Sequence, residues 1–180
     1  MTKSKVEPID RYIFQGEERL FLDANVWLSV YGPLGRRNAR SAAYSDALKR
    51  IRSAGCLILL DVLVVSEFIN AFARMEYRQS ASGSSGFKHF RKSASFAPVA
   101  KDIAQNTRRI LRQCQRCNSS FTTADIDALI REFELGNSDF NDQMIAEICR
   151  TESLHLVTDD ADFKGTGLFI LTANRFLLKR

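Results

Sequence analysis

Residues that commonly bind zinc are scarce in this sequence, which has two histidines and four cysteines among 180 residues. His89 and His155 lie far apart, and neither has a partner at metal-ligand spacing. Cys114 and Cys117 form a Cys-x-x-Cys pair, but no second pair completes a tetrahedral site. The sequence therefore favours neither a zinc centre nor a disulfide framework, and we expect reduced thiols.

Long apolar runs are also missing from the chain. No stretch of about 18 uncharged apolar residues is present, and residues 1–14 contain basic side chains without the apolar core of a secretory signal. We therefore expect a cytoplasmic protein that does not enter a membrane. With 45% hydrophobic residues, the chain can bury one sizeable core, and its length predicts a single domain over residues 1–180.

Charge is unevenly distributed along the chain. The formal net charge is +5 and the isoelectric point is near 9.2. Lysine and arginine concentrate in residues 35–52, 87–92 and 108–116, whereas acidic residues gather after Thr123. Basic segments around an acidic centre suit a metal-dependent site that acts on phosphates.

Short apolar runs alternate with amphipathic segments. Runs at 20–22, 56–60, 154–158 and 167–172 predict buried strands. Helical spacing is present over 39–54, 62–79, 98–117, 122–136 and 138–152, and the Ser- and Gly-rich residues 80–86 predict a loop. This alternation predicts an α/β fold with a mainly parallel central sheet flanked by helices.

Acidic residues recur where the predicted strands end or the helices begin. Asp23 and Asp160 follow strands, whereas Glu67 and Asp142 lie in early turns of helices. The carboxyl ends of parallel strands share one edge, so we expect these side chains to meet there. Carboxylates cannot share a dry crevice without a cation, and an all-oxygen ligand set favours Mg²⁺ or Mn²⁺. The sequence therefore predicts a divalent metal site.

The motifs around these acids are "LDANVW", "VVSEF", "DFNDQMIA" and "LVTDDADF". In that order they resemble the motifs of PIN-domain nucleases, and among these the VapC-like ribonuclease toxins of type II toxin–antitoxin pairs. The resemblance covers residues 20 to about 178. It implies a PIN-like three-layer α/β/α fold and a Mg²⁺- or Mn²⁺-dependent endoribonuclease that hydrolyses RNA. It also implies a small antitoxin protein as partner, with a homodimer as a candidate assembly.

The resemblance assigns roles to the acids. It implies Asp23, Glu67, Asp142 and Asp160 as catalytic and metal-binding residues, and Asp162 is a further candidate metal ligand. Asp159 receives no predicted role.

Polar neighbours are candidates for supporting residues. Asn25 and Thr158 are placed to hydrogen-bond a carboxylate or a phosphate. Asp139 precedes Asp142 at the same predicted helix start, where a capping role fits equally well.

The segment from about residue 80 to 122 is longer than in compact VapC-like toxins, and we predict a helical insertion there. Its cations exceed what folding requires, and the acidic crevice repels phosphate, so we predict that they bind RNA. The predicted RNA-binding residues are Lys88, Arg91, Lys92, Arg108, Arg109 and Arg112. The alternative RNA path follows Arg36, Arg37 and Arg40.

Other functions remain open from the sequence. A housekeeping RNA-processing nuclease and a non-catalytic RNA- or protein-binding domain both fit the same motifs. A phosphatase of the haloacid dehalogenase type fits less well, because the second aspartate that it requires is Asn25 here. A structure-specific DNA nuclease is disfavoured, because the short chain has no appended DNA-binding module.

Overall fold

The computed structural model describes residues 4–33, 39–80, 86–136 and 138–179. Arg36, Arg37 and residues 81–85 of the predicted loop lie outside this part of the chain. Within it, one sheet has the order β1-β6-β5-β2-β3-β4, and every pairing is parallel. The strands are β1 (Lys5–Pro8), β2 (Arg19–Leu22), β3 (Leu57–Leu60), β4 (Gln115–Arg116), β5 (His155–Val157) and β6 (Phe169–Thr172).

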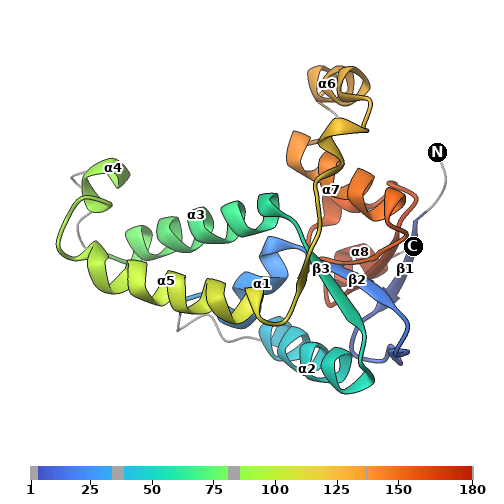
Figure 1. Cartoon of the computed structure of the whole chain (residues 1–180), viewed down its shortest axis with the longest axis horizontal. Helices are drawn as coiled ribbons and strands as arrows, with labels where there is room; N and C mark the ends of the chain where they lie inside the picture. The colour runs from blue at the N-terminus through green and yellow to red at the C-terminus, as the bar shows by residue number, and fades with distance from the viewer. Residues whose placement is uncertain (1–3, 34–38, 81–85, 137, 180) are drawn as a thin grey trace.

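Helices cover both faces of the sheet. They are α1 (Ala24–Tyr31), α2 (Ala39–Ala54), α3 (Val62–Gln79), α4 (Phe87–Phe90), α5 (Phe96–Leu111), α6 (Ile126–Glu134), α7 (Phe140–Thr151) and α8 (Arg175–Leu178), with short 3₁₀ turns η1 (Ser120–Thr122) and η2 (Ala161–Phe163). In Figure 1, α2 lies on one side of the sheet and α7 on the other. The predicted three-layer α/β/α arrangement is confirmed. None of the described helices is long and apolar enough to span a membrane.

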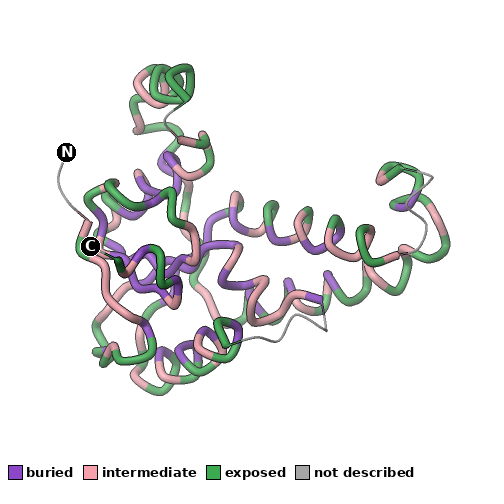
Figure 2. Tube along the Cα trace, turned by 180° about the vertical axis from the view of Figure 1, so that it is seen from behind, coloured by how far each residue is buried: buried purple, intermediate pink, exposed green. Residues whose placement is uncertain are grey.

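The core is built around the central strands β2 and β5. Leu20, Phe21, Leu156 and Val157 are fully buried, because helices pack on both faces of a parallel sheet. Trp27 on α1 adds the largest fully buried side chain. In Figure 2, buried residues concentrate in the sheet and the helices beside it, whereas α6 is mainly exposed.

Two edge strands differ from the sequence prediction. Strand β1 was not predicted, because "KVEP" has charged residues and a proline rather than an apolar run. Residues 115–116 were predicted as the end of a helix that continued to Cys117, and this was wrong. That helix, α5, ends at Leu111, and Gln115 and Arg116 pair with β3 instead. Exposed edge strands are held by backbone hydrogen bonds, so their sequences need no apolar alternation.

Helices α3, α4 and α5 form a projection that we call the arm. Helices α3 and α5 lie side by side along most of the arm, and α4 lies at its tip (Figure 1). Ile103, Thr107 and Ile110 form the buried stripe of α5, as their spacing predicts, and Phe68 and Phe72 are buried on α3. The arm therefore holds together through a narrow apolar seam between two helices.

Candidate active site

The site lies at the carboxyl edge of the sheet, between β2 and β5. The chain runs from β2 toward β3 on one side and from β5 toward β6 on the other, so the ends of β2 and β5 border a topological switch point. Asp23 follows β2 directly, is only 4% exposed, and donates its backbone N–H to Val157 O at 3.0 Å. Its carboxylate is therefore fixed at the mouth of the crevice that parallel sheets form at such points.

A hydrogen-bond network holds the Asp23 carboxylate. The Thr158 hydroxyl donates to Asp23 Oδ2 at 2.7 Å, and Asn25 Nδ2 donates to the same oxygen. Thr158 Oγ1 also accepts the backbone N–H of Asp160 at 3.0 Å. The two predicted supporting residues Asn25 and Thr158 thus contact Asp23, and they join the end of β2 to the loop after β5.

Three further carboxylates meet beside this network. Oxygen atoms of Asp142, Asp160 and Asp162 all lie within 4.8 Å of one another. Asp142 comes from the first turn of α7, and Asp160 caps η2 by accepting the backbone N–H of Asp162 at 2.9 Å. The structure therefore brings together acids separated by about twenty residues in the sequence, as predicted for acids that follow strands or begin helices.

Glu67 and Asp139 lie at the border of the same cluster. The charges of Asp23, Asp139 and Asp160 all act on Glu67, which approaches from α3. Asp139 is the N-cap of α7 and accepts the backbone N–H of Asn141 at 2.8 Å. The capping interpretation of Asp139 therefore describes its geometry, while its charge still adds to the field of the cluster.

The carboxyl groups of the cluster hold protons more tightly than ordinary acids. Burial raises the pKa of Asp23 to about 6, against the lowering effect of the Thr158 hydrogen bond. Desolvation, then the charges of Asp23, Asp139 and Asp160, raise the pKa of Glu67 to about 7. Desolvation and the neighbouring charges, that of Asp160 first, raise the pKa of Asp142 to about 7. Without a cation, the ionised cluster is electrostatically unfavourable near neutral pH.

The donor set fits a hard divalent cation. Asp142, Asp160 and Asp162 each offer a carboxylate oxygen to one shared position, and no histidine or cysteine belongs to this group among the described residues. All-oxygen sets of this kind suit Mg²⁺ or Mn²⁺ rather than zinc. These three side chains would hold the ion, with Asp23 and Glu67 adding negative charge beside it.

Two acids at this edge were not predicted to have a structural role. Asp159 Oδ1 accepts the Tyr44 hydroxyl at 2.9 Å, and Oδ2 forms an ion pair with Arg40 at 2.8 Å, so Asp159 ties α2 to the loop after β5. Asp61 follows β3, is 1% exposed, and caps α3 by accepting the Leu63 N–H at 2.8 Å. Only its position at a strand end could have pointed to Asp61 from the sequence.

Comparison with known proteins places these residues in a wider group. The family model of the PIN domain matches residues 20–167. A structure of VapBC2 from Rickettsia felis, bound to a DNA fragment from their promoter, is similar in fold with a TM-score of 0.53. It has 15% sequence identity over 84% of this chain and 96% of that chain. PAE2754 from Pyrobaculum aerophilum has 19% identity over 86% of this chain and 91% of that chain, with a TM-score of 0.47. No curated protein matches the chain.

The raised pKa values predict that the metal-free protein loses stability as pH rises. The folded chain binds more protons than the unfolded chain between about pH 4 and pH 7, so the free energy of unfolding should fall across that window. Asp142→Asn removes one titrating group and should flatten this dependence. Because solvent screens this half-exposed carboxylate, we expect a gain in stability at pH 8 of only about 1 to 3 kcal/mol. Urea unfolding in EDTA at several pH values measures the effect.

Asp102→Asn is the matched control, because Asp102 is an exposed acid on α5 outside the cluster. The free energy of unfolding of the Asp102→Asn variant should depend on pH as that of the wild type does. Equal slopes for Asp142→Asn and the wild type would contradict the electrostatic interpretation of the cluster.

Proposed function

The chain belongs to the PIN-domain family, and on that premise we propose that it is a Mg²⁺- or Mn²⁺-dependent endoribonuclease that hydrolyses RNA phosphodiester bonds. PIN domains are generally nucleases. The observation that supports the proposal best is the convergence of Asp142, Asp160 and Asp162 within 4.8 Å of one another, near the switch point where Asp23 follows β2. A cluster of this kind, at one edge of the sheet, repels a negatively charged substrate unless a divalent cation binds between them. It therefore suits a phosphate substrate that binds together with the cation.

The residues of the chain divide the work at this site. When bound, a divalent ion would lower the pKa of a water molecule and neutralise charge that develops on the attacked phosphate. Asp142, Asp160 and Asp162 hold the ion in this proposal. Thr158 and Asn25 fix the Asp23 carboxylate through hydrogen bonds, so that it does not rotate away from the cluster.

Replacing a cluster acid should abolish cleavage. Asp23→Asn and Asp142→Asn each keep the side-chain shape but remove a charge, and we expect RNA cleavage to fall by more than about 100-fold. EDTA should stop the wild-type reaction, and Mg²⁺ or Mn²⁺ should restore it. Cleavage of a labelled RNA on denaturing gels measures the rates, and circular dichroism checks the fold.

Glu17→Gln removes an exposed charge outside both the acid cluster and the arm, so it is the control here and should cleave RNA at the wild-type rate. Full activity of purified Asp142→Asn would contradict the proposed site. If the wild-type protein binds RNA but does not cleave it in Mg²⁺ or Mn²⁺, the result would instead favour a non-catalytic RNA-binding domain.

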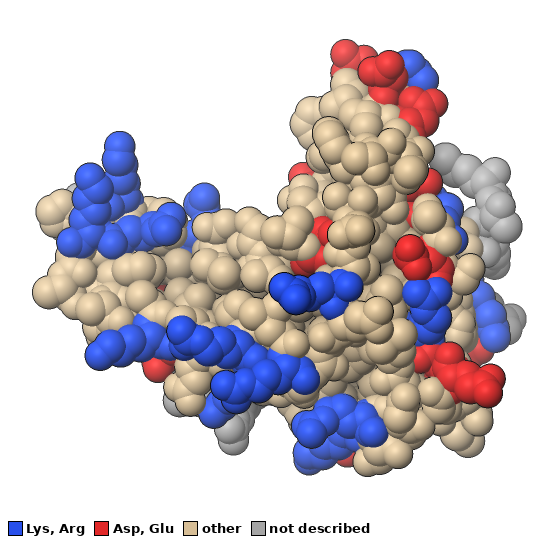
Figure 3. Space-filling model, viewed as in Figure 1, with Lys and Arg blue, Asp and Glu red and all other residues tan. Residues whose placement is uncertain are grey.

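The cations of the arm are proposed to bind the RNA strand. Lys and Arg side chains gather along the arm in Figure 3. The exposed residues Arg108, Arg109 and Arg112 lie at and just after the end of α5. The other predicted RNA-binding residues, Lys88, Arg91 and Lys92, lie on or beside α4 at the tip. Helix α3 alone extends about 18 Å beyond Glu67, at about 1.5 Å per residue, so an RNA that reaches both ends of the arm spans several nucleotides.

Aromatic residues of the tip pack within the arm. Phe90 is 4% exposed, and Phe87 is half-buried against Tyr77 with the Arg74 guanidinium 5.1 Å from its ring centroid. These rings stabilise the turn between α4 and α5, and Phe90 in particular has no open face on which a base could stack. The tip therefore offers RNA its cations rather than a stacking surface.

Removing charge from α5 should weaken RNA binding and its salt dependence. In Ca²⁺, where cleavage is expected to stall, the triple variant Arg108→Ala, Arg109→Ala, Arg112→Ala should flatten the log–log salt slope by about 0.7 for each phosphate that is no longer neutralised. The triple variant Arg11→Ala, Lys49→Ala, Arg52→Ala removes three exposed cations elsewhere and is the control. If the salt slope of the α5 triple variant is unchanged but the variant no longer binds a protein partner, the arm is a docking surface for that protein and not for RNA.

We further propose that the protein is the toxin of a type II pair and binds a small antitoxin protein. Its surface suits a protein partner, because Ile130, Phe133 and Leu135 on and after α6 are 43 to 70% exposed, and Phe121 nearby is 56% exposed. Helix α6 has no buried residue. The same apolar surface is available to a second copy of the chain, which is the candidate homodimer.

Expression of the wild-type chain should slow bacterial growth, and co-expression of a small neighbouring reading frame should restore it. Growth curves and co-purification of the two products measure this. Asp142→Asn is the control, and it should not slow growth but should still bind the partner. Normal growth with an active enzyme, and no partner gene, would favour a housekeeping RNA-processing nuclease.

A further inference from the structure

A second cavity opens at the same edge of the sheet, between α2 and α8, and we call it the α2–α8 pocket. Its volume is about 760 Å³, which is large enough for a nucleotide. The fully buried Thr172 at the end of β6 and the adjoining Ala173 form part of its wall. The cavity is distinct from the acid cluster, because no member of that cluster lines it.

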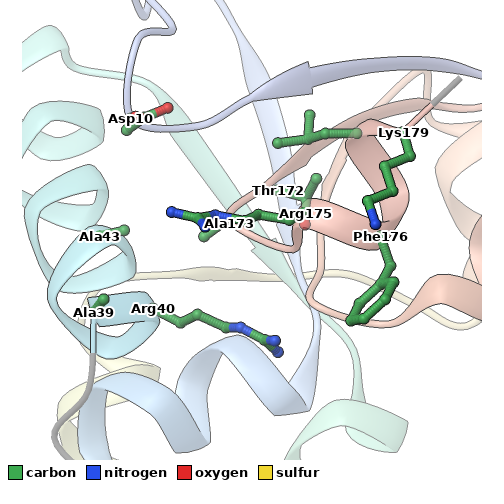
Figure 4. A pocket seen from close by; sticks show the side chains of 10 residues that line it. Asp10, Ala39, Arg40, Ala43, Thr172, Ala173, Arg175, Phe176 and Lys179 are labelled. Atoms are coloured by element: carbon green, nitrogen blue, oxygen red, sulfur yellow. The ribbon is translucent and has the colours of Figure 1, made fainter.

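The charge of the pocket is positive. Arg40, Arg175 and Lys179 line it against one acid, Asp10. Figure 4 shows Arg40 and Arg175 extending into the space between α2 and α8 from the two sides. Among the described residues, no carboxylate lies within ion-pair distance of Arg175 or Lys179, so their charges are available to a ligand. Arg40 forms its ion pair with Asp159 and is thereby held in position.

An exposed aromatic ring accompanies these cations. Phe176 lines the pocket and is 64% exposed, whereas its neighbour Leu177 is buried. The Lys179 ammonium lies 5.2 Å from the Phe176 ring centroid and covers one face of the ring. Cations beside an open aromatic face are the combination by which proteins bind single-stranded nucleic acids, with phosphates on the cations and a base on the ring.

The pocket adjoins the acid cluster through an ion pair. Arg40 in the first turn of α2 pairs with Asp159 at 2.8 Å, and Asp159 directly precedes Asp160 of the cluster. Tyr44, one helical turn further along α2, bonds the same carboxylate. If the phosphate to be cleaved lies at the acid cluster, a neighbouring nucleotide of the same RNA strand would thus reach the α2–α8 pocket.

We propose that the α2–α8 pocket binds a nucleotide of the RNA strand that flanks the cleaved bond, with Arg175 and Arg40 contacting its phosphate and Phe176 stacking on its base. This inference rests on the proposed nuclease function and adds a subsite to it. It also gives the Asp159–Arg40 pair a purpose, which is to align the subsite with the acids.

Binding of a short fluorescein-labelled single-stranded oligoribonucleotide in Ca²⁺ tests the subsite by anisotropy at several salt concentrations. Phe176→Ala should weaken binding by about 10-fold or more with an unchanged salt slope, because stacking is removed but no charge is. Arg175→Ala should flatten the slope by about 0.7, because one phosphate is no longer neutralised. Phe176→Trp should retain wild-type affinity.

Exposed residues elsewhere provide matched controls, namely Ile13→Ala for the ring and Arg52→Ala for the cation. Wild-type affinity and slope in both Phe176→Ala and Arg175→Ala would overturn the subsite, even if the enzyme cleaves RNA normally. If the variants change RNA binding as predicted but the wild-type protein does not cleave RNA, only the proposed nuclease function is contradicted. Adenosine monophosphate binding as tightly as the oligonucleotide, in a Phe176-dependent way, would overturn the assignment to a strand.

Discussion

Mutual repulsion among carboxylates at the ends of β2 and β5 constrains the arrangement of the whole carboxyl edge. Asp23, Glu67 and Asp142 all have raised pKa values, because packing removes water from charges that already repel one another. Asp23 is held beside the other acids by the buried end of β2 and by its hydrogen bond from Thr158. The amino end of α7 offsets part of the repulsion, since its dipole favours the negative charge of Asp142.

In the loop after β5, neighbouring residues contact different parts of the protein. Thr158 bonds to Asp23, Asp159 bonds to α2, and Asp160 belongs to the acid cluster. These three neighbouring side chains therefore have three different partners, although they lie in one short loop. The dense acids of "TDDAD" thus combine one structural carboxylate with two that fit a metal ion.

The sequence predicted the parts of this fold that depend on burial. Strands β2, β3, β5 and β6 are apolar because both faces are covered, and Asp23 and Asp160 could be predicted to share one edge because they follow such strands. Strands β1 and β4 could not be found in this way, since backbone pairing at an edge leaves little trace in side chains. Asp159 was also out of reach, because its partners Tyr44 and Arg40 lie 115 and 119 residues away in the chain.

The pairing of α3 with α5 makes the arm an adjustable spacer. Both helices leave and return to the sheet between the neighbouring strands β3 and β4, so the whole arm is one excursion within a single crossover. Adding one turn to each helix would move the tip outward by about 5.4 Å without altering any strand or acid. The length of the arm can therefore change without a change in the acid cluster, if matched turns are inserted into α3 beyond Glu67 and into α5.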